Sequence, residues 1–528
     1  MVRKELQILL EGSIKELQKE KAFPVFDMPE IKLEYPENRD HGDYASNIAM
    51  VLAKQVRKSP KEVADLLILK LKTKDNRFKI ESAGPRFINF IISKDYLEKK
   101  IEDILGQKDK FGGVDAGRKE KINIEFISAN PTGPLTMGNA RGGFCGDVLA
   151  NVLNKAGYNV SREYYINNMG KQIDLLKDSL GGKSGYNNQY INTLKSKNEK
   201  NVKKALDYIV GETKKTTQKM GIKFDKWFYE SDLYKSKETE KVLKILEKKN
   251  LVYKKDDAIW FKSSQFGDDK DRVLIRKNDK ETYFLSDIAY LSNKFKRGFK
   301  KLIIFLGADH YGYVGRMKAA AEALGYEKKQ VDLVIMQLVS IMWAESEGPK
   351  KVVRMSKRKG VYKTIEELIG EKAGEGLGLD VARFFFLLRS PGSHLVFDLD
   401  LAKQQSKKNP VFYVQYAYAR ISSILKKAKA IKSKLQQNNL REPSELNLAK
   451  LLIRLPEVVE DTSRDYQVQR LPQYAMELAT SFHKFYQDCR VISEDKNIVQ
   501  SRLTLVLATR IVLKNTLELM GVSAPEKM

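Results

Sequence analysis

The sequence predicts a multidomain protein with an α+β unit, an α/β core containing a parallel sheet, and an α-helical bundle. The chain has 528 residues, which is too long for one hydrophobic core. In its middle part, short apolar runs alternate with helical patterns, as in parallel sheets. Beyond about residue 400 the strand signals fade and helical patterns dominate. We therefore expect three domains, over residues 1–110, 111–400 and 401–528.

The first 110 residues contain both helix and strand signals. Apolar residues recur at helical spacing from Leu6 to Leu17. Ser59, Pro60 and Glu62 form a capping box with proline at the first helical position, so a helix should begin there. Residues 86–92 (RFINFII) read as a strand. The segment is therefore a small α+β domain.

The middle part has the pattern of a βαβ unit. Residues 121–127 (KINIEFI) have the apolar pattern of a buried strand. Residues 142–156 carry an apolar helical face, and residues 160–166 have the pattern of a second strand. A Lys-rich stretch at about 170–280 reads as a helical insertion. After it, residues 301–307 (KLIIFLG) supply another apolar strand. A parallel sheet with a helical insertion is the predicted core.

Charge and cysteine content narrow the class of protein. Lys and Arg number 95 against 68 Asp and Glu, a net charge of +27, which favours nucleic acid or an anionic membrane surface as a partner; a solvated Lys-rich surface is the alternative. No apolar run is long enough for a membrane span, and acidic residues interrupt the first helix, which excludes a signal peptide. Two cysteines, Cys145 and Cys489, provide no zinc motif and no disulfide framework. We expect a cytoplasmic protein that does not insert into membranes.

The segment ANPTGPLTMGNARGG at 129–143 is the first candidate site. It places four glycines and two prolines between a strand and a helix start, where backbone N–H groups and the helix dipole favour phosphate. Arg141 would add a fixed positive charge. A merely tight turn is the alternative reading. The segment matches neither GxGxxG nor GxxxxGKS, which argues against a dinucleotide-binding domain and a Walker-type ATPase.

The segment VVRMSKRKG at 352–360 is the second candidate site. It places four cations within six residues, after Gly348 and Pro349, on an expected mobile loop. A basic loop can close on a triphosphate and stabilise charge as pyrophosphate leaves. A solvated basic loop is the alternative.

Together these two segments resemble the paired signature motifs of class I aminoacyl-tRNA synthetases, and within that class the chain is similar to the arginyl-tRNA synthetase family. The resemblance covers nearly the whole chain, in the stretches HGDYASNIAM, AGPRFINF, IEFISANPTGP, SREYYINNMGKQ, YFLSDIAY, FLGADHYGYVGRMKAA, DVARFFFLLRS, SHLVFDLDLA, NPVFYVQYAYARISSIL, FYQDCRV and GVSAPEKM. It implies a Rossmann-like catalytic core, an N-terminal tRNA-binding domain and a C-terminal anticodon-binding domain.

The resemblance also implies the reaction and its partners. The expected activity is ATP-dependent ligation of L-arginine to tRNA(Arg) through an arginyl-adenylate, with AMP and pyrophosphate as products. ATP would bind with Mg²⁺, and no zinc or tightly bound cofactor is expected. Activation of arginine would wait for tRNA, and the protein would be a monomer.

The chain departs from the family pattern within the nucleotide motifs. Thr136 and Asn139 stand where histidines are usual, whereas Gly138 is kept; Arg354 replaces the usual first lysine, whereas Lys357 is kept. The implied catalytic residues are Lys357, Gly138, Asn139, Thr136 and Arg141. The implied ATP contacts are Pro134, Thr136, Gly138, Asn139, His310, Met355, Ser356 and Lys357.

The predicted amino-acid pocket centres on a carboxylate. A guanidinium is a planar fork that favours a carboxylate in bidentate register, and Asp287 is our candidate, with a solvent-facing helical acid as the alternative. Tyr283, four residues earlier, and Glu125, at the end of the first core strand, also match arginine-binding positions of the family. Asn130 and Ser128 match positions that hold the α-amino and carboxylate groups of the amino acid.

The predicted anticodon site is aromatic. Tyr413 and Tyr416 share one helical face with Arg420, and Tyr486 lies in a later helix. By pattern alone such a stripe is more often core than a base-stacking platform. The resemblance implies that Tyr413, Tyr416, Tyr486 and Met528 contact the anticodon.

Two rival functions stay open at this point. One is a tRNA-binding paralogue that has lost catalysis, suggested by the missing histidines; retention of Lys357, Asp287 and Asn130 speaks against it. The other is a class I ligase for a different amino acid, for which a guanidinium pocket would be unexpected.

Overall fold

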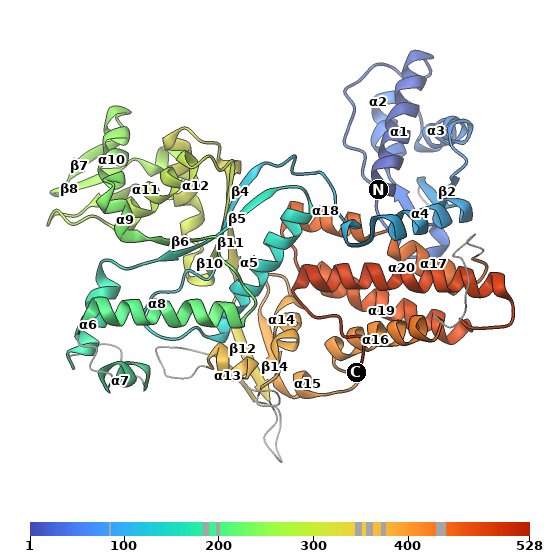
Figure 1. The fold of residues 1–528 in the computed structure, drawn as a ribbon. Helices are drawn as coiled ribbons and strands as arrows, with labels where there is room; N and C mark the ends of the chain where they lie inside the picture. Colours follow the sequence, from blue (N-terminus) through green and yellow to red (C-terminus); the bar gives the residue numbers. More distant parts are fainter. Residues whose placement is uncertain are drawn as a thin grey trace.

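The computed structural model shows an α/β core with two further domains on one side of it, and these two domains pack against each other (Figure 1). The structure describes residues 1–83, 86–182, 189–196, 201–343, 351–354, 363–370, 376–428 and 440–528. Among these residues, no helix combines the length and the apolar character that a bilayer crossing requires.

The N-terminal domain is α+β, as predicted. A three-stranded antiparallel sheet with the order β1-β3-β2 packs against four helices. The strands are β1 (Tyr44–Ser46), β2 (Phe78–Ala83) and β3 (Phe87–Ile92), and the helices are α1 (Val2–Lys19), α2 (Ile48–Val56), α3 (Pro60–Lys74) and α4 (Lys94–Gln107). The predicted capping box opens α3: the Glu62 amide donates to Ser59 Oγ at 3.2 Å, and Glu62 Oε2 accepts from the Ser59 amide at 2.8 Å.

The core sheet is parallel and has five strands in the order β11-β10-β4-β5-β6. The strands are β4 (Lys121–Glu125), β5 (Asn159–Ile166), β6 (Lys226–Tyr229), β10 (Lys301–Gly307) and β11 (Val331–Met336), and α5 (Met137–Lys155) connects β4 to β5. The chain proceeds from β4 to β5 and β6 in one direction, and from β10 to β11 in the other. A topological switch point therefore lies between β4 and β10, where open α/β sheets bind ligands beyond the carboxyl ends of the strands.

The insertion is not wholly helical, contrary to our prediction. Its helices are α6 (Lys171–Leu180), α7 (Gln189–Ser196), α8 (Val202–Lys219), α9 (Glu230–Lys235) and α10 (Glu238–Lys248), but β6 interrupts them. An antiparallel sheet follows, with β7 (Val252–Lys255), β8 (Ala258–Phe261) and β9 (Arg272–Ile275). Asp256 and Asp257, which join β7 to β8, both have positive φ, at 53° and 55°. This is the geometry of a two-residue hairpin turn, and four-residue strands are too short to show clear alternation.

The rest of the core carries the helices and the small sheet that complete the site. Helix α11 (Tyr283–Lys296) precedes β10, and α12 (Tyr313–Leu324) follows it. A second sheet has the order β13-β12-β14, with β12 (Val339–Trp343), β13 (Lys351–Arg354) and β14 (Leu395–Asp398). The neighbouring helices are α13 (Ile365–Ile369), α14 (Leu379–Leu387) and α15 (Leu399–Lys403).

The C-terminal domain is the predicted helical bundle. Its helices are α16 (Pro410–Ala428), α17 (Pro443–Leu452), α18 (Leu455–Asp465), α19 (Arg470–Asp488) and α20 (Lys496–Met520). Prolines open α16 and α17, where a missing N–H costs no hydrogen bond. Helix α20 packs against α4 of the N-terminal domain, α5 of the core and three helices of its own bundle.

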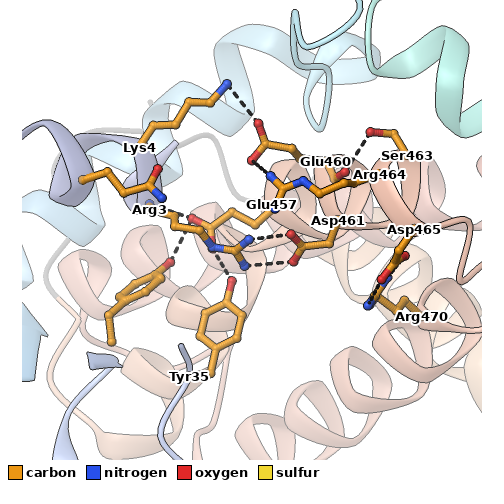
Figure 2. Close-up of polar contacts among 12 residues, drawn as sticks. Arg3, Lys4, Tyr35, Glu457, Glu460, Asp461, Ser463, Arg464, Asp465 and Arg470 are labelled. Carbon is orange, nitrogen blue, oxygen red and sulfur yellow. Dashed lines mark hydrogen bonds and ion pairs between the residues drawn. The ribbon is translucent and has the colours of Figure 1, made fainter. Parts of the chain in front are cut away.

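A charged cluster joins the N-terminal domain to α18 (Figure 2). The buried carboxylate of Glu457 accepts hydrogen bonds from the Arg3 amide at 2.8 Å and from the hydroxyls of Tyr35 and Tyr44. The Arg3 guanidinium donates two bonds to Asp461, at 2.6 and 2.9 Å. Because these groups are largely withdrawn from water, the contact fixes the relative orientation of the two domains.

Candidate active site

A cleft of about 220 Å³ lies at the switch point, and we call it the glycine-lined cleft. Its walls come from the segment after β4, the carboxyl end of β10 and the carboxyl end of β11. They comprise Ile127, Thr136, Gly138, Asn139, Gly142, Phe305, Leu306, Gly307, Ala308, Asp309, Met336, Gln337, Leu338 and Val339. The first signature segment therefore borders a cavity at the place where the fold favours ligands.

The two residues that replace the usual histidines engage each other. Asn139 Oδ1 accepts hydrogen bonds from the Thr136 amide at 3.0 Å and from the Thr136 hydroxyl at 3.1 Å. This pairing fixes the orientation of the Asn139 amide and leaves its Nδ2 as a donor for a ligand. The Thr136 hydroxyl proton is already used, so of these two predicted ATP contacts only Asn139 offers a side-chain donor to a ligand.

Glycine keeps the cleft open at the start of α5. A Cβ added at Gly138 would meet only Thr136 Oγ1, at 3.8 Å, and one at Gly142 would meet no atom within 4 Å. A side chain at either position would therefore extend into the cavity. The positive end of the α5 dipole lies at this wall, where a phosphate group is stabilised.

Arg141 does not supply the phosphate charge that we predicted. Its side chain is buried, and its terminal nitrogens donate to the carbonyl oxygens of Gln337, Leu338, Ser390 and Ser393 at 2.6–3.3 Å. Arg141 does not line the cleft itself, although two of its carbonyl partners belong to the cleft residues Gln337 and Leu338. Arg141 instead ties α5 to the segments after β11 and α14.

The second signature segment lies only partly within the described residues. Met355, Ser356 and Lys357 lie outside them. On one side, Arg354 of β13 lies opposite Ser340 of β12 in the antiparallel strand pair, and Ser340 is next to the cleft residue Val339. On the other, the Lys363 carbonyl accepts from the Met137 amide at 3.2 Å, and the Ile365 amide donates to the Leu135 carbonyl at 3.1 Å. Both flanks of the segment are thus attached beside the glycine-lined cleft.

The backbone turns sharply where β4 ends. Ile127 and Ser128 both have positive φ, at 66° and 35°, which is unfavourable for a β-branched residue and typical of functional sites. Ser128 Oγ accepts from the Tyr165 amide at 3.0 Å. Asn130 is exposed and Pro134 half-buried in the loop that follows. These residues follow β4 in the chain, and of them only Ile127 lines the cleft; Ser128, Asn130 and Pro134 do not.

A second, smaller cavity of about 80 Å³ lies between α11, α12 and the sheet, and we call it the acidic pocket. It is lined by Glu125, Tyr165, Asp287, Tyr290, Leu291, Lys294, Ile304, Leu306, Tyr313, Met317 and Leu333. Leu306 also lines the glycine-lined cleft, so the two cavities adjoin at the end of β10.

Asp287 is the carboxylate of this pocket that has no cationic partner among the described residues. Tyr313 donates to its Oδ2 at 2.6 Å. The pKa of Asp287 is raised to about 7, mainly because the group is desolvated and also because of the charges of Glu230 and Glu125; the Tyr313 hydrogen bond and the charge of Lys294 oppose this rise. Such a carboxylate favours a cation that replaces its lost hydration.

Glu125 also lines the pocket, but Lys294 neutralises it. Lys294 Nζ lies 2.5 Å from Glu125 Oε2, and the Lys294 side chain is fully buried. Beneath this pair, Glu163 accepts from Tyr290 at 2.6 Å and from Arg297 at 2.7 and 2.8 Å. The pocket floor is therefore a network of paired charges.

Two predicted contacts lie outside both cavities. The Tyr283 side chain is 37% exposed, and its hydroxyl accepts from the Lys171 amide at 2.9 Å, so it contacts the insertion and does not line the acidic pocket. His310 follows the cleft residues Ala308 and Asp309 in a short 3₁₀ turn, with Nε2 3.7 Å from the Asp309 carboxylate. It is positioned at the rim of the cleft.

Three residues line the acidic pocket that were not predicted from the sequence: Tyr313, Tyr165 and Lys294. Lys294 had a signal: Asp287, Tyr290, Leu291 and Lys294 follow the i, i+3, i+4, i+7 pattern of one helical face, and all four line the pocket. Tyr313 had none, because its contact with Asp287 joins two helices that are separate in the sequence.

The predicted anticodon tyrosines come together between α16 and α19. The Arg420 guanidinium lies over the rings of Tyr416 and Tyr486, at 4.8 and 5.0 Å from their centroids. The Tyr413 ring packs against His483, with centroids 4.9 Å apart. Tyr486 is 39% exposed and Met528 55% exposed. The stripe is thus a partly exposed aromatic cluster with one cation, not a buried core.

No group of three or more potential metal ligands among His, Cys, Asp and Glu occurs within the described parts of the chain.

Three family models match the chain. Residues 4–92 match the arginyl tRNA synthetase N-terminal domain, residues 100–186 and 183–377 match the catalytic domain of tRNA synthetases class I (R), and residues 414–528 match the DALR anticodon binding domain. The arginine–tRNA ligase of Moorella thermoacetica is 40% identical, over 95% of this chain and 94% of that protein. The arginine–tRNA ligase of Shouchella clausii is 41% identical over 100% of both chains.

Solved structures give the same fold. The arginyl-tRNA synthetase of Thermus thermophilus has a TM-score of 0.77 and 21% identity, with 100% of both chains covered. A methionyl-tRNA synthetase of Mycobacterium tuberculosis has a TM-score of 0.56 and 12% identity, covering 76% of this chain and 91% of that one. Both likenesses are confined to the fold.

Proposed function

Because the chain belongs to the arginyl-tRNA synthetase family and its activity is therefore arginyl-tRNA aminoacylation, we propose that the acidic pocket binds the arginine guanidinium and that the glycine-lined cleft binds ATP. The observation that carries this assignment is the position of Asp287: a half-buried carboxylate, with no cationic partner among the described residues, lines a pocket that shares Leu306 with the cleft at the switch point. Only a guanidinium combines a planar fork with the charge that this carboxylate favours.

In the proposed complex, the arginine side chain enters the acidic pocket and its α-carboxylate points to the cleft. The Asp287 carboxylate accepts two hydrogen bonds from the guanidinium, while Ser128 and Asn130, which follow β4, would hold the α-amino and carboxylate groups. Tyr313 orients Asp287 through its 2.6 Å hydrogen bond. A site that satisfies the fork rejects analogues without it strongly, because the carboxylate would stay buried and unpaired.

ATP would bind along the start of α5. The Asn139 amide donates to a phosphate or ribose oxygen, Gly138 and Gly142 let the nucleotide approach the helix, and His310 borders the rim. Mg²⁺ would arrive with the phosphates, which suit this ion because it keeps oxygen ligands and water; Asp309 is the carboxylate in the cleft wall. The attached flanks of the second segment support a role for Met355, Ser356 and Lys357 at the triphosphate.

The reaction follows from this placement. The arginine carboxylate attacks the α-phosphate, and pyrophosphate leaves while Lys357 stabilises its charge. The terminal ribose hydroxyl of tRNA then attacks the adenylate carbonyl, and AMP leaves. Positioning and charge stabilisation carry both steps, so no nucleophilic side chain is required.

The tRNA would contact both flanking domains. The partly exposed cluster of Tyr413, Tyr416 and Tyr486 can stack with anticodon bases, and Arg420 adds a cation. The exposed Met528 is a further candidate contact. The net charge of +27 suits the polyanion. We propose that the protein acts as a monomer in the cytoplasm, with its domains at about 1–110, 111–400 and 401–528.

Arginine-dependent pyrophosphate exchange, measured with and without tRNA(Arg), tests the proposal. We expect exchange with arginine and tRNA. No exchange under either condition would favour a paralogue that has lost catalysis, and exchange driven by another amino acid would contradict the assigned pocket.

A further inference from the structure

The acidic pocket contains a buried cation that the proposed reaction does not use. Lys294 is fully buried and comes from the same face of α11 as Asp287. A buried ammonium is costly unless it is paired, and here the ammonium pairs with Glu125 at 2.5 Å and lies 4.2 Å from the centroid of the Tyr290 ring. A positive charge in a pocket for a cationic substrate calls for an explanation.

Charge balance supplies that explanation. With Glu125 and Asp287 ionised and Lys294 protonated, the lining residues carry one net negative charge, which equals in magnitude the charge of one guanidinium. Without Lys294, two carboxylates would share a cavity of about 80 Å³, and carboxylates in such a site retain a proton that a cationic ligand must displace.

We propose that Lys294 is a positioning residue of the arginine pocket: it holds Glu125 and offsets its charge, so that the pocket presents one net negative charge to the guanidinium. The inference rests on the proposed function, because it assumes that arginine binds in this pocket. The mechanism above already assigns the guanidinium contact to Asp287; Lys294 acts through Glu125 and needs no contact with substrate.

The surroundings of Asp287 agree with this role. The titratable groups that face it come from five elements: Glu125 of β4, Tyr165 of β5, Glu230 and Tyr234 of α9, Tyr290 and Lys294 of α11, and Tyr313 of α12. Among them Lys294 is the cation, and its charge lowers the pKa of Asp287, whereas Glu125 and Glu230 raise it. Removal of Lys294 should therefore raise the pKa of Asp287, so that this carboxyl group keeps its proton up to a higher pH.

The test is the pH dependence of the arginine KM in pyrophosphate exchange with saturating ATP and tRNA(Arg). For Lys294→Met we expect the midpoint of this dependence to move up by about one pH unit or more, with a changed arginine KM and an ATP KM within about twofold of the original. Lys296→Met is the matched control, since Lys296 lies on the same helix but pairs with Glu238 at the surface; its midpoint should not move.

A double variant, Lys294→Met with Glu125→Gln, separates charge balance from loss of structure. It removes both members of the ion pair and restores one net negative charge, so we expect the midpoint to return toward the original and the arginine KM to recover from that of the single variant. If the single variant does not fold, the double variant can still be measured, because removal of both Lys294 and Glu125 leaves no unpaired buried charge. In that case we expect the midpoint of the original chain, and a displaced midpoint would overturn the inference.

Two results would contradict the inference: an unmoved midpoint in folded Lys294→Met, or a double variant whose midpoint is displaced as far as that of the single variant. Failure of the proposed function has a different signature, which is an unaltered arginine KM in Asp287→Asn. If Asp287→Asn raises the arginine KM and Lys294→Met leaves the midpoint of the pH dependence unchanged, the role of Lys294 is contradicted but the arginine pocket is not.

Discussion

Replacement of Asp287 by asparagine tests the arginine pocket most directly. Asparagine keeps the shape of the side chain and an oxygen that can accept the Tyr313 hydrogen bond, but it removes the charge. Loss of one partner of a desolvated, hydrogen-bonded ion pair costs about 2–5 kcal/mol. Taking about 3 kcal/mol, the arginine KM should rise by about two orders of magnitude, while the ATP KM changes little.

The pH profile adds a second measurement to this test. The pKa of Asp287 is raised to about 7 in the empty protein, so the pocket is protonated below this pH and ionised above it. Arginine requires the ionised form, and its apparent KM should therefore rise on acidification, by about tenfold from pH 8 to pH 6. In Asp287→Asn this dependence should disappear, because the titrating group is gone.

The assay is arginine-dependent pyrophosphate exchange with saturating tRNA(Arg) from pH 6 to 8.5. Tyr313→Phe is the matched variant: it retains the carboxylate but removes a hydrogen bond that lowers the pKa of Asp287, so its profile should shift to higher pH. An unchanged arginine KM in Asp287→Asn, or an acid-sensitive KM in that variant, would refute the assignment.

Three further predictions concern other parts of the chain. Lys357→Ala should lower the rate of arginine activation far more than the affinity for tRNA, and unchanged turnover would remove that residue from the mechanism. Tyr416→Ala should raise the tRNA KM by about tenfold or more, since base stacking contributes about 1–3 kcal/mol, with no effect on the arginine KM at saturating tRNA; an unaltered tRNA KM would argue against an anticodon role. Glu457→Ala should lower the free energy of unfolding in urea by about 3 kcal/mol, because it leaves buried partners unpaired. Glu460→Ala should cost less, because the Glu460 carboxylate pairs with the exposed side chains of Lys4 and Arg464, which water can solvate; equal effects would contradict the role of the cluster.

Local patterns made much of the fold predictable. The capping box at Ser59, the βαβ unit from β4 to β5 and the apolar strand β10 each follow from residues close in sequence. The short strands β6 to β9 were not predicted, because four residues give too little alternation to distinguish a strand from the helices around it.

The candidate site was predictable where it follows helical geometry and unpredictable where it depends on tertiary contacts. The spacing of α11 placed Lys294 on the face of Asp287, and the spacing of α5 placed Arg141 on the opposite face from Asn139. The hydrogen bond from Tyr313 and the contact of Tyr283 with the insertion depend on how separate elements pack. Resemblance identified residue types at the site but not these partners.

Helix α20 limits how the chain can be divided. Its 25 residues span about 37 Å, and its last turn is held by Arg383, which donates to the Met520 carbonyl at 2.9 Å, and by Asn151, which donates to the Leu519 carbonyl at 3.0 Å. One helix thus supplies packing surface to all three domains. Removal of α20 should therefore unfold the chain as a whole. A chimaera between two relatives would need to take the N-terminal domain and the C-terminal bundle, which includes α20, from the same parent.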